Sequence, residues 1–226
     1  MSGYNSYMHE LTKKEGLLVI SRHAESEWNA LGKWTGWTDI GLSQQGQNDA
    51  VLMGGVLKDI NFDVAYTSEL TRAKQTLDGI LKGKGDQPNL TRLASSALNE
   101  RDYGDLTGKN KWEVQKEIGQ NAFEGIRRGW DYPVPGGETL KDVHARAWPY
   151  FVAEILPRLQ KGENILLVAH GNSIRALMKE LDDVPEADMS KVEMPIGTIL
   201  LYHFGPNETR PKSKEVRVTE AMSKGA

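Results

Sequence analysis

Residues 16–26 read Gly-Leu-Leu-Val-Ile-Ser-Arg-His-Ala-Glu-Ser, and residues 164–173 follow a similar pattern, Asn-Ile-Leu-Leu-Val-Ala-His-Gly-Asn-Ser. In each stretch a short, almost wholly apolar run is followed by a histidine and small polar residues. Such runs are typical of strands that a parallel sheet buries on both faces. Because open α/β sheets bind ligands at the carboxyl ends of their strands, the pattern predicts a site containing His23 and His170.

The chain between these runs alternates further strands with amphipathic helices. Residues 64–67 and 198–203 are predicted strands. Apolar residues at helical spacing follow a possible cap at Ser43, and Thr139 with Asp142 predicts a capping box. The alternation predicts an α/β fold, a three-layer αβα sandwich around a mostly parallel central sheet.

The two ends of the chain lack this alternation. Residues 1–15 are polar and without periodicity, which predicts a flexible N-terminal extension. Residues 207–226 are charged and poor in large apolar side chains, which predicts a mobile C-terminal tail. One folded domain is therefore expected over residues 16–206.

Composition excludes several classes of protein. The 226 residues include no cysteine, so there is no disulfide scaffold, thiol nucleophile or thiolate metal site, and a cytoplasmic location is expected. Lys and Arg number 28 against 31 Asp and Glu, a net charge of −3 that does not favour nucleic acid or membrane partners. No run approaches the roughly 20 apolar residues of a membrane span. An anionic ligand would therefore need a local cluster of cationic side chains at its binding site.

Four residues near the predicted strand ends suit phosphoryl transfer. A neutral imidazole such as His23 can accept a phosphoryl group. Arg22 adjoins it, and Arg72 falls in the first turn of a helix after residues 64–67, where a guanidinium and a helix N-terminus together favour an anion. Glu100 is the candidate general acid for the leaving oxygen.

Other interpretations of these residues remain open at this stage. Glu100 could be a surface carboxylate paired with Arg101, and Arg127-Arg128 could be a solvated helix face. The motifs G-x-x-x-x-G-K-[ST], H-E-x-x-H and G-x-S-x-G do not occur. A metal site would have to use the two histidines and carboxylates beside arginines that repel a cation, so no metal is expected.

Longer motifs carry a family resemblance. Thr35-Gly36-Trp37, Leu98-Asn99-Glu100-Arg101-x-Tyr103-Gly104 and Ala169-His170-Gly171-Asn172-Ser173 occur in this order, after Arg22-His23. From about Leu17 to about Phe204 the chain resembles the cofactor-dependent phosphoglycerate mutases of the histidine phosphatase superfamily. Arg-His alone marks only the superfamily, whereas the other three motifs point to the mutase branch.

The resemblance implies an isomerase of glycolysis and gluconeogenesis that interconverts 3-phosphoglycerate and 2-phosphoglycerate, primed by 2,3-bisphosphoglycerate and using no metal. It implies that His23 is the phosphorylated nucleophile and Glu100 the proton donor and acceptor, and that His170, Arg22 and Arg72 stabilise the phosphoryl group. The substrate-binding residues that it implies are Arg22, Ser26, Asn29, Thr35, Gly36, Arg72, Glu100, Arg101, Tyr103, Lys111, Arg127, Arg128, Gly171 and Asn172.

Three features depart from the mutase pattern. Ala24 stands where Gly is usual, and its Cβ could crowd the phosphate or forbid a positive φ. Residues 129–136 lack an insertion of roughly 20 to 25 residues found in longer mutases, so a homo-oligomer is possible but its state does not transfer. Thr107 replaces a common Gln. The alternatives are a histidine phosphatase acting on a small phosphorylated metabolite and a catalytically inactive phosphate-binding protein, which Ala24 would favour.

Overall fold

The computed structural model describes residues 14–85 and 87–219, and a six-stranded sheet of order β3-β2-β4-β1-β5-β6 organises them. The strands are β1 (Gly16–Arg22), β2 (Val64–Thr67), β3 (Thr91–Ala94), β4 (Asn164–Ala169), β5 (Thr198–Phe204) and β6 (Ser213–Val218). Strands β3, β2, β4 and β1 pair in parallel, whereas β1 with β5 and β5 with β6 pair antiparallel. The predicted mostly parallel sheet is confirmed.

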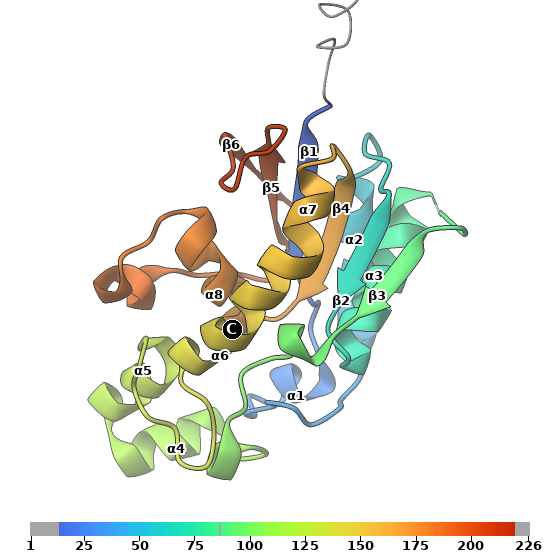
Figure 1. Cartoon of the computed structure of the whole chain (residues 1–226). Coiled ribbons are helices and arrows are strands. Elements are labelled where there is room, and N and C mark those ends of the chain that lie inside the picture. The colour runs from blue at the N-terminus through green and yellow to red at the C-terminus, as the bar shows by residue number, and fades with distance from the viewer. Residues whose placement is uncertain (1–13, 86, 220–226) are drawn as a thin grey trace, which may run out of the picture.

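Helices cover both faces of the sheet, as Figure 1 shows. One face packs against α2 (Gln44–Gly55) and α3 (Thr71–Lys84), and the other against α6 (Leu140–Tyr150), a π-helical turn (Phe151–Ile155), α7 (Leu156–Leu159) and α8 (Gly171–Leu181). Within β1, Leu18 and Ile20 contact the second set of helices and Val19 the first. A strand between two apolar layers has no polar face, which is why its sequence does not alternate. The three-layer prediction is confirmed.

The predicted helix starts are present. The Ser43 hydroxyl accepts a hydrogen bond from the Gly46 N–H at 3.0 Å at the start of α2. Thr139 and Asp142 form a reciprocal capping box before α6. None of the described helices combines the length and apolar character needed to cross a bilayer.

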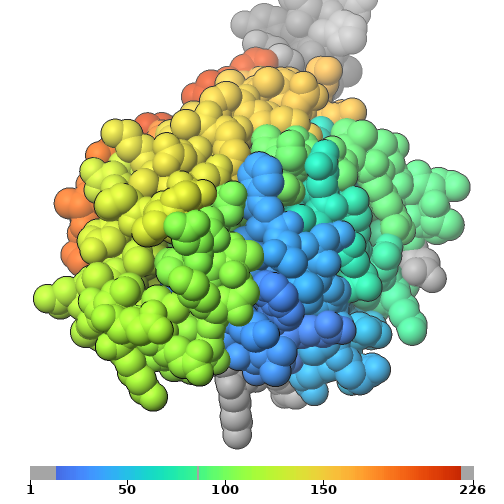
Figure 2. Space-filling model, turned by 90° about the horizontal axis from the view of Figure 1, so that it is seen from below, coloured from blue at the N-terminus to red at the C-terminus, as the bar shows by residue number. Residues whose placement is uncertain are grey.

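A smaller group of helices lies beyond the carboxyl ends of the parallel strands, at the bottom of Figure 1. It comprises α1 (Glu27–Ala30), α4 (Lys111–Ile118) and α5 (Gln120–Arg128). Trp34, Tyr103, Phe123 and Ile126 form a separate apolar cluster there. Seen from below in Figure 2, the region of α1 (blue) lies beside that of α4 and α5 (green).

The prediction of a mobile tail over residues 207–226 is wrong for Ser213–Val218, which form β6. This strand pairs with β5 from Thr198 opposite Val218 to His203 opposite Ser213. Its side chains are mostly exposed, so its sequence lacks the apolar run that would predict a buried strand. Backbone hydrogen bonds to β5 hold the strand in the sheet. Residues 220–226, and residues 1–13 of the predicted N-terminal extension, lie outside the described residues.

Candidate active site

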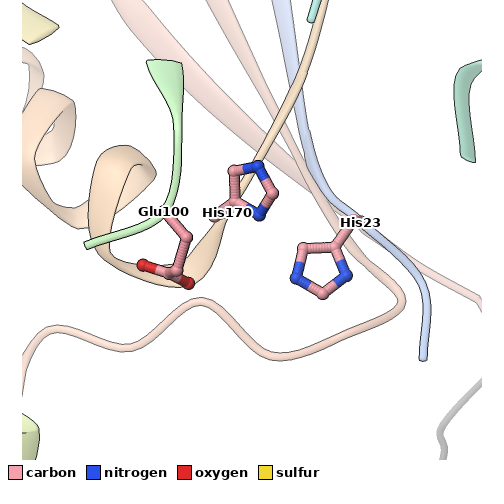
Figure 3. A group of neighbouring side chains, drawn as sticks. All are labelled: His23, Glu100 and His170. Atoms are coloured by element: carbon pink, nitrogen blue, oxygen red, sulfur yellow. The ribbon is translucent and has the colours of Figure 1, made fainter. Parts of the chain in front are cut away.

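The register of the sheet brings the two predicted histidines together. Arg22 at the end of β1 lies opposite Ala169 at the end of β4. The N–H of His23 donates to the Ala169 carbonyl oxygen at 2.8 Å, and the ring centroids of His23 and His170 lie 4.9 Å apart. Figure 3 shows both imidazoles with the Glu100 carboxylate beside them.

His23 is held as a neutral imidazole with one free nitrogen. Its Nδ1 lies 2.7 Å from the carbonyl oxygen of Ala24. Because a carbonyl oxygen only accepts, Nδ1 carries the proton and Nε2 keeps its lone pair. Burial, followed by the charges of Arg72 and Arg22, lowers the pKa of His23 well below its usual value. A neutral imidazole with a free Nε2 is the form that a nucleophile requires.

Glu100 is buried in the same group, which excludes the interpretation as a surface carboxylate. Its Oε1 accepts hydrogen bonds from the backbone N–H of Arg101 at 2.7 Å and from Nδ2 of Asn172 at 2.9 Å. One ligand-type atom from each of Glu100, His23 and His170 lies within 4.8 Å of the others. Since Oε1 is occupied, Oε2 is the oxygen available to exchange a proton.

His170 is oriented by a residue that sequence reasoning missed. Its Nε2 lies 2.7 Å from the Oγ of Ser68, directly after β2. Its Nδ1 is buried and has no hydrogen-bond partner among the described residues. Burial and the charges of Arg72 and His23 lower the pKa of His170 well below its usual value. Ser68 could have been found by the signal that identified His23, since both follow a buried strand.

A cavity of about 530 Å³ adjoins His23. Among the described residues, seven cationic side chains line it, those of Arg22, Lys33, Arg72, Lys111, Arg127, Arg128 and Arg175, against the carboxylates of Glu100 and Glu193. Burial, Arg22 and Arg127 lower the pKa of Lys111 to about 8. This local excess of positive charge suits a multiply charged anion.

The backbone around the cavity holds Arg72 and Arg22 in place. Arg72 donates to the carbonyl oxygens of Gly36 at 2.8 Å and Thr38 at 3.1 Å, in a turn where Gly36 adopts a φ of +53°. Nη1 of Arg22 donates to the Met194 carbonyl oxygen at 3.1 Å, and its Nε is buried without a partner among the described residues. Burial lowers the pKa of Arg72 to about 10, so its guanidinium is still charged at neutral pH.

Most residues predicted to bind substrate line the cavity, namely Arg22, Asn29, Thr35, Gly36, Arg72, Glu100, Tyr103, Lys111, Arg127, Arg128, Gly171 and Asn172. Two described residues, Ser26 and Arg101, lie behind its wall instead. Ser26 caps α1, and its hydroxyl bonds the side chain of Asn29. Arg101 is fully buried and donates to the Tyr103 hydroxyl and to the carbonyl oxygen of Ile126. A contiguous motif does not reveal which of its members face a ligand.

Sequence reasoning also missed residues that shape the site from other elements. Arg175 lines the cavity from α8, five positions after His170. Arg146 comes from α6 and donates to the carbonyl oxygens of Asn99 at 3.0 Å and Glu100 at 2.9 Å. Arg175 continues the His170 motif, whereas nothing near Arg146 in the sequence points to Glu100.

Ala24 does not obstruct the site. Its methyl group is buried in the apolar cluster between the sheet, α2 and α3. The described non-glycine residues with positive φ are Asp183 and Asn207, so Ala24 needs no conformation that favours glycine. Its N–H donates to the Thr76 hydroxyl at 3.0 Å.

The fold and the site define a class, the α/β proteins that transfer phosphoryl groups by way of a histidine. Residues 18–217 match the model of the histidine phosphatase superfamily, branch 1. The chain is 43% identical over 203 residues to the 2,3-bisphosphoglycerate-dependent phosphoglycerate mutase of Chelativorans sp. (strain BNC1), covering 89% of this chain and 98% of the relative. It is 46% identical over 197 residues to the protein of the same name from Bradyrhizobium sp. (strain BTAi1), covering 86% and 95%.

The fold also resembles a solved structure, that of the mycobacterial glucosyl-3-phosphoglycerate phosphatase Rv2419c. The TM-score is 0.73 at 26% sequence identity, over 93% of this chain and 100% of that one. The chain belongs to the histidine phosphatase superfamily and, within it, to the family of the 2,3-bisphosphoglycerate-dependent phosphoglycerate mutases.

Proposed function

We propose that this chain interconverts 3-phosphoglycerate and 2-phosphoglycerate through phosphorylation of His23. The observation that carries the proposal is the neutral imidazole of His23, whose Nδ1 is bonded to the Ala24 carbonyl oxygen beside a cavity lined with cations. Relatives 43% and 46% identical bear the name of that activity.

The cavity fits the primer implied by the family. Arg22 Nε and Thr35 Oγ1 are buried polar atoms without partners among the described residues, and both residues line the cavity. Such atoms suit an anion with many acceptor oxygens. When bound, 2,3-bisphosphoglycerate supplies the phosphoryl group that loads His23.

The side chains divide the transfer between them. In one half-reaction the bond between phosphorus and His23 Nε2 breaks, a bond to the substrate hydroxyl oxygen forms, and Glu100 accepts the hydroxyl proton. In the other half-reaction Nε2 forms a bond to the phosphorus that the substrate carried at the start. The bond between that phosphorus and its substrate oxygen breaks, and Glu100 returns the proton to this leaving oxygen. Arg22, Arg72 and His170 stabilise the transferring oxygens.

Two further groups hold the rest of the substrate. Arg127 and Arg128 line the cavity from α5, whereas Arg22 lines it from the end of a strand. The two groups would therefore contact a phosphoglycerate from different sides. The Tyr103 hydroxyl accepts hydrogen bonds from Arg101 and Asn172, which leaves its own proton for a ligand oxygen.

The test is an assay of 3-phosphoglycerate conversion with and without 2,3-bisphosphoglycerate. Isomerisation is expected only with the primer, and His23→Ala should abolish both turnover and acid-labile phosphorylation. His144→Ala is the matched control, because His144 pairs with Glu180 instead of lining the cavity. Primer-independent conversion, or undiminished phosphorylation of the His23 variant, would contradict the proposal.

The proposal also includes a metal-free mechanism and a location in the cytoplasm. Arg22 and Arg72 weaken any cation site formed by His23, Glu100 and His170. Activity should therefore persist in EDTA, and its loss with recovery on adding a divalent ion would contradict the metal-free mechanism.

The second candidate function is hydrolysis of a small phosphorylated metabolite. The likeness to a glucosyl-3-phosphoglycerate phosphatase favours it. In such an enzyme water, instead of a hydroxyl group of the substrate, would take the phosphoryl group from His23. Release of inorganic phosphate faster than isomerisation in the same assay would favour this function.

A further inference from the structure

Two buried arginines hold the carbonyl groups that end α5. Nη2 of Arg101 donates to the carbonyl oxygen of Ile126 at 2.6 Å and reaches that of Arg127 at 3.4 Å. Arg175 reaches the carbonyl of Arg127 with Nη1 at 3.4 Å, and donates to that of Arg128 with Nη2 at 2.8 Å. The last carbonyl groups of a helix have no hydrogen-bond partner within the helix. Here the two arginine side chains bind three successive carbonyl groups, those of Ile126, Arg127 and Arg128.

The hydrogen-bond partners of these two arginines are neutral groups. Arg101 is 0% and Arg175 4% exposed. Besides the helix carbonyls, Arg101 bonds the Tyr103 hydroxyl, while Arg175 bonds Oδ1 of Asn172 at 2.9 Å and the carbonyl oxygen of Met189 at 2.7 Å. Burying unpaired cations is unfavourable, and the negative end of the helix dipole offsets only part of that free energy.

The rest of α5 constrains its last turn weakly. The N-cap residue of the helix is Gly119, which has a φ of +80° and supplies no side-chain cap. Phe123 and Ile126 pack with Trp34 and Tyr103 in a buried apolar cluster, and this packing fixes which face of the helix is buried. In the last turn, Arg127 lies over the Phe123 ring at 5.4 Å from its centroid, and Arg128 pairs with Glu193 at 2.7 Å. Arg101 and Arg175 hold the backbone from which both side chains extend.

We propose that Arg101 and Arg175 are positioning residues that fix the backbone of the last turn of α5, from which Arg127 and Arg128 line the cavity. A bound anion would take the place of Glu193 beside Arg128. The inference rests on the proposed function for the identity of that anion. A phosphoglycerate has a carboxylate besides its phosphate and would need the positioned pair. Inorganic phosphate has no carboxylate and can bind beside His23 without Arg127 and Arg128, so it would not need the positioned pair.

The variants Arg101→Lys and Arg175→Lys test this. Lysine keeps the charge but cannot make the parallel hydrogen bonds of a guanidinium. Arg92→Lys is the matched control, because Arg92 forms an exposed ion pair with Asp78 outside the cavity. Calorimetry should show affinity for 3-phosphoglycerate falling roughly tenfold in both test variants, as expected for lost buried hydrogen bonds to charged groups, with affinity for inorganic phosphate nearly unchanged.

A second measurement separates positioning from direct contact, since Arg175 itself lines the cavity. In the ligand-free protein, hydrogen exchange at the end of α5 should accelerate in both variants, while β1 and β4 keep their protection. If Arg101→Lys fails to fold, Arg175→Lys carries both measurements.

Equal losses for the two ligands, or unchanged exchange in α5, would overturn the inference. Neither binding nor exchange requires turnover. Absence of isomerisation by the unaltered protein would therefore count against the proposed function alone.

Discussion

At the scale of single residues, one carbonyl oxygen decides the chemistry of His23. The Ala24 carbonyl accepts from Nδ1 and so assigns the lone pair to Nε2. Burial, followed by the charges of Arg72 and Arg22, lowers the pKa of His23, so the arginines that favour an anion also favour the neutral imidazole. In the proposed mechanism, the same two cations favour the neutral nucleophile and bind the phosphoryl group that it attacks.

Lys111 makes substrate capture sensitive to mildly alkaline pH. Its pKa is lowered to about 8, so the amine is protonated below that pH and neutral above it. We expect kcat/KM for 3-phosphoglycerate to fall by roughly tenfold as pH rises from 7 to 9, because the free enzyme loses one cavity charge. Lys111→Arg should remove the inflection near pH 8. Persistence of the inflection in that variant would assign it to another group.

At the scale of elements, α6 fixes the loop that carries Glu100. Arg146 binds the Glu138 carboxylate through Nε and Nη2 while it holds the carbonyls of Asn99 and Glu100. Trp37 Nε1 donates to the same Glu100 carbonyl at 2.6 Å. Glu100, the proposed general acid, is thus positioned by segments far away in sequence.

Arg146→Lys should therefore lower kcat by roughly tenfold, with little change in KM, because the Glu100 loop loses several hydrogen bonds. Thr139→Ala is the matched control in the same helix. It should lower the free energy of unfolding by about 1 kcal/mol through loss of the N-cap, without changing kcat. A proportional loss of kcat in both variants in steady-state kinetics would argue against positioning by Arg146.

The last strand matters for stability. β6 pairs with β5 along six residues, and Arg217 binds Asp59 through two hydrogen bonds. Deleting residues 213–226 should lower the free energy of unfolding by roughly 3 kcal/mol or more, since several ladder hydrogen bonds are lost. Urea denaturation checks this. An unchanged midpoint would contradict a stabilising role for β6.

At the scale of the whole molecule, a net charge of −3 coexists with the seven cationic side chains that line one cavity in the described part of the chain. Repulsion among those cations destabilises the empty protein, and a bound anion relieves it. We expect 3-phosphoglycerate at about 100 times its Kd to raise the free energy of unfolding by about 2.7 kcal/mol. Thermal denaturation should show a higher midpoint with the ligand than with chloride at equal ionic strength. Equal midpoints would contradict specific binding.

The layered sheet, the helix caps and the two histidines at the strand ends could be predicted from the amino-acid sequence. These features are local, since burial on both faces requires a continuous apolar run such as residues 16–21, and a cap requires Ser43 within hydrogen-bond reach of its own helix. Three other features required the folded structure: β6 joins the sheet, Arg101 lies behind the cavity wall, and Arg146 holds the Glu100 carbonyl. These features depend on backbone pairing and on contacts between residues that are distant in sequence. Local sequence patterns do not indicate such contacts.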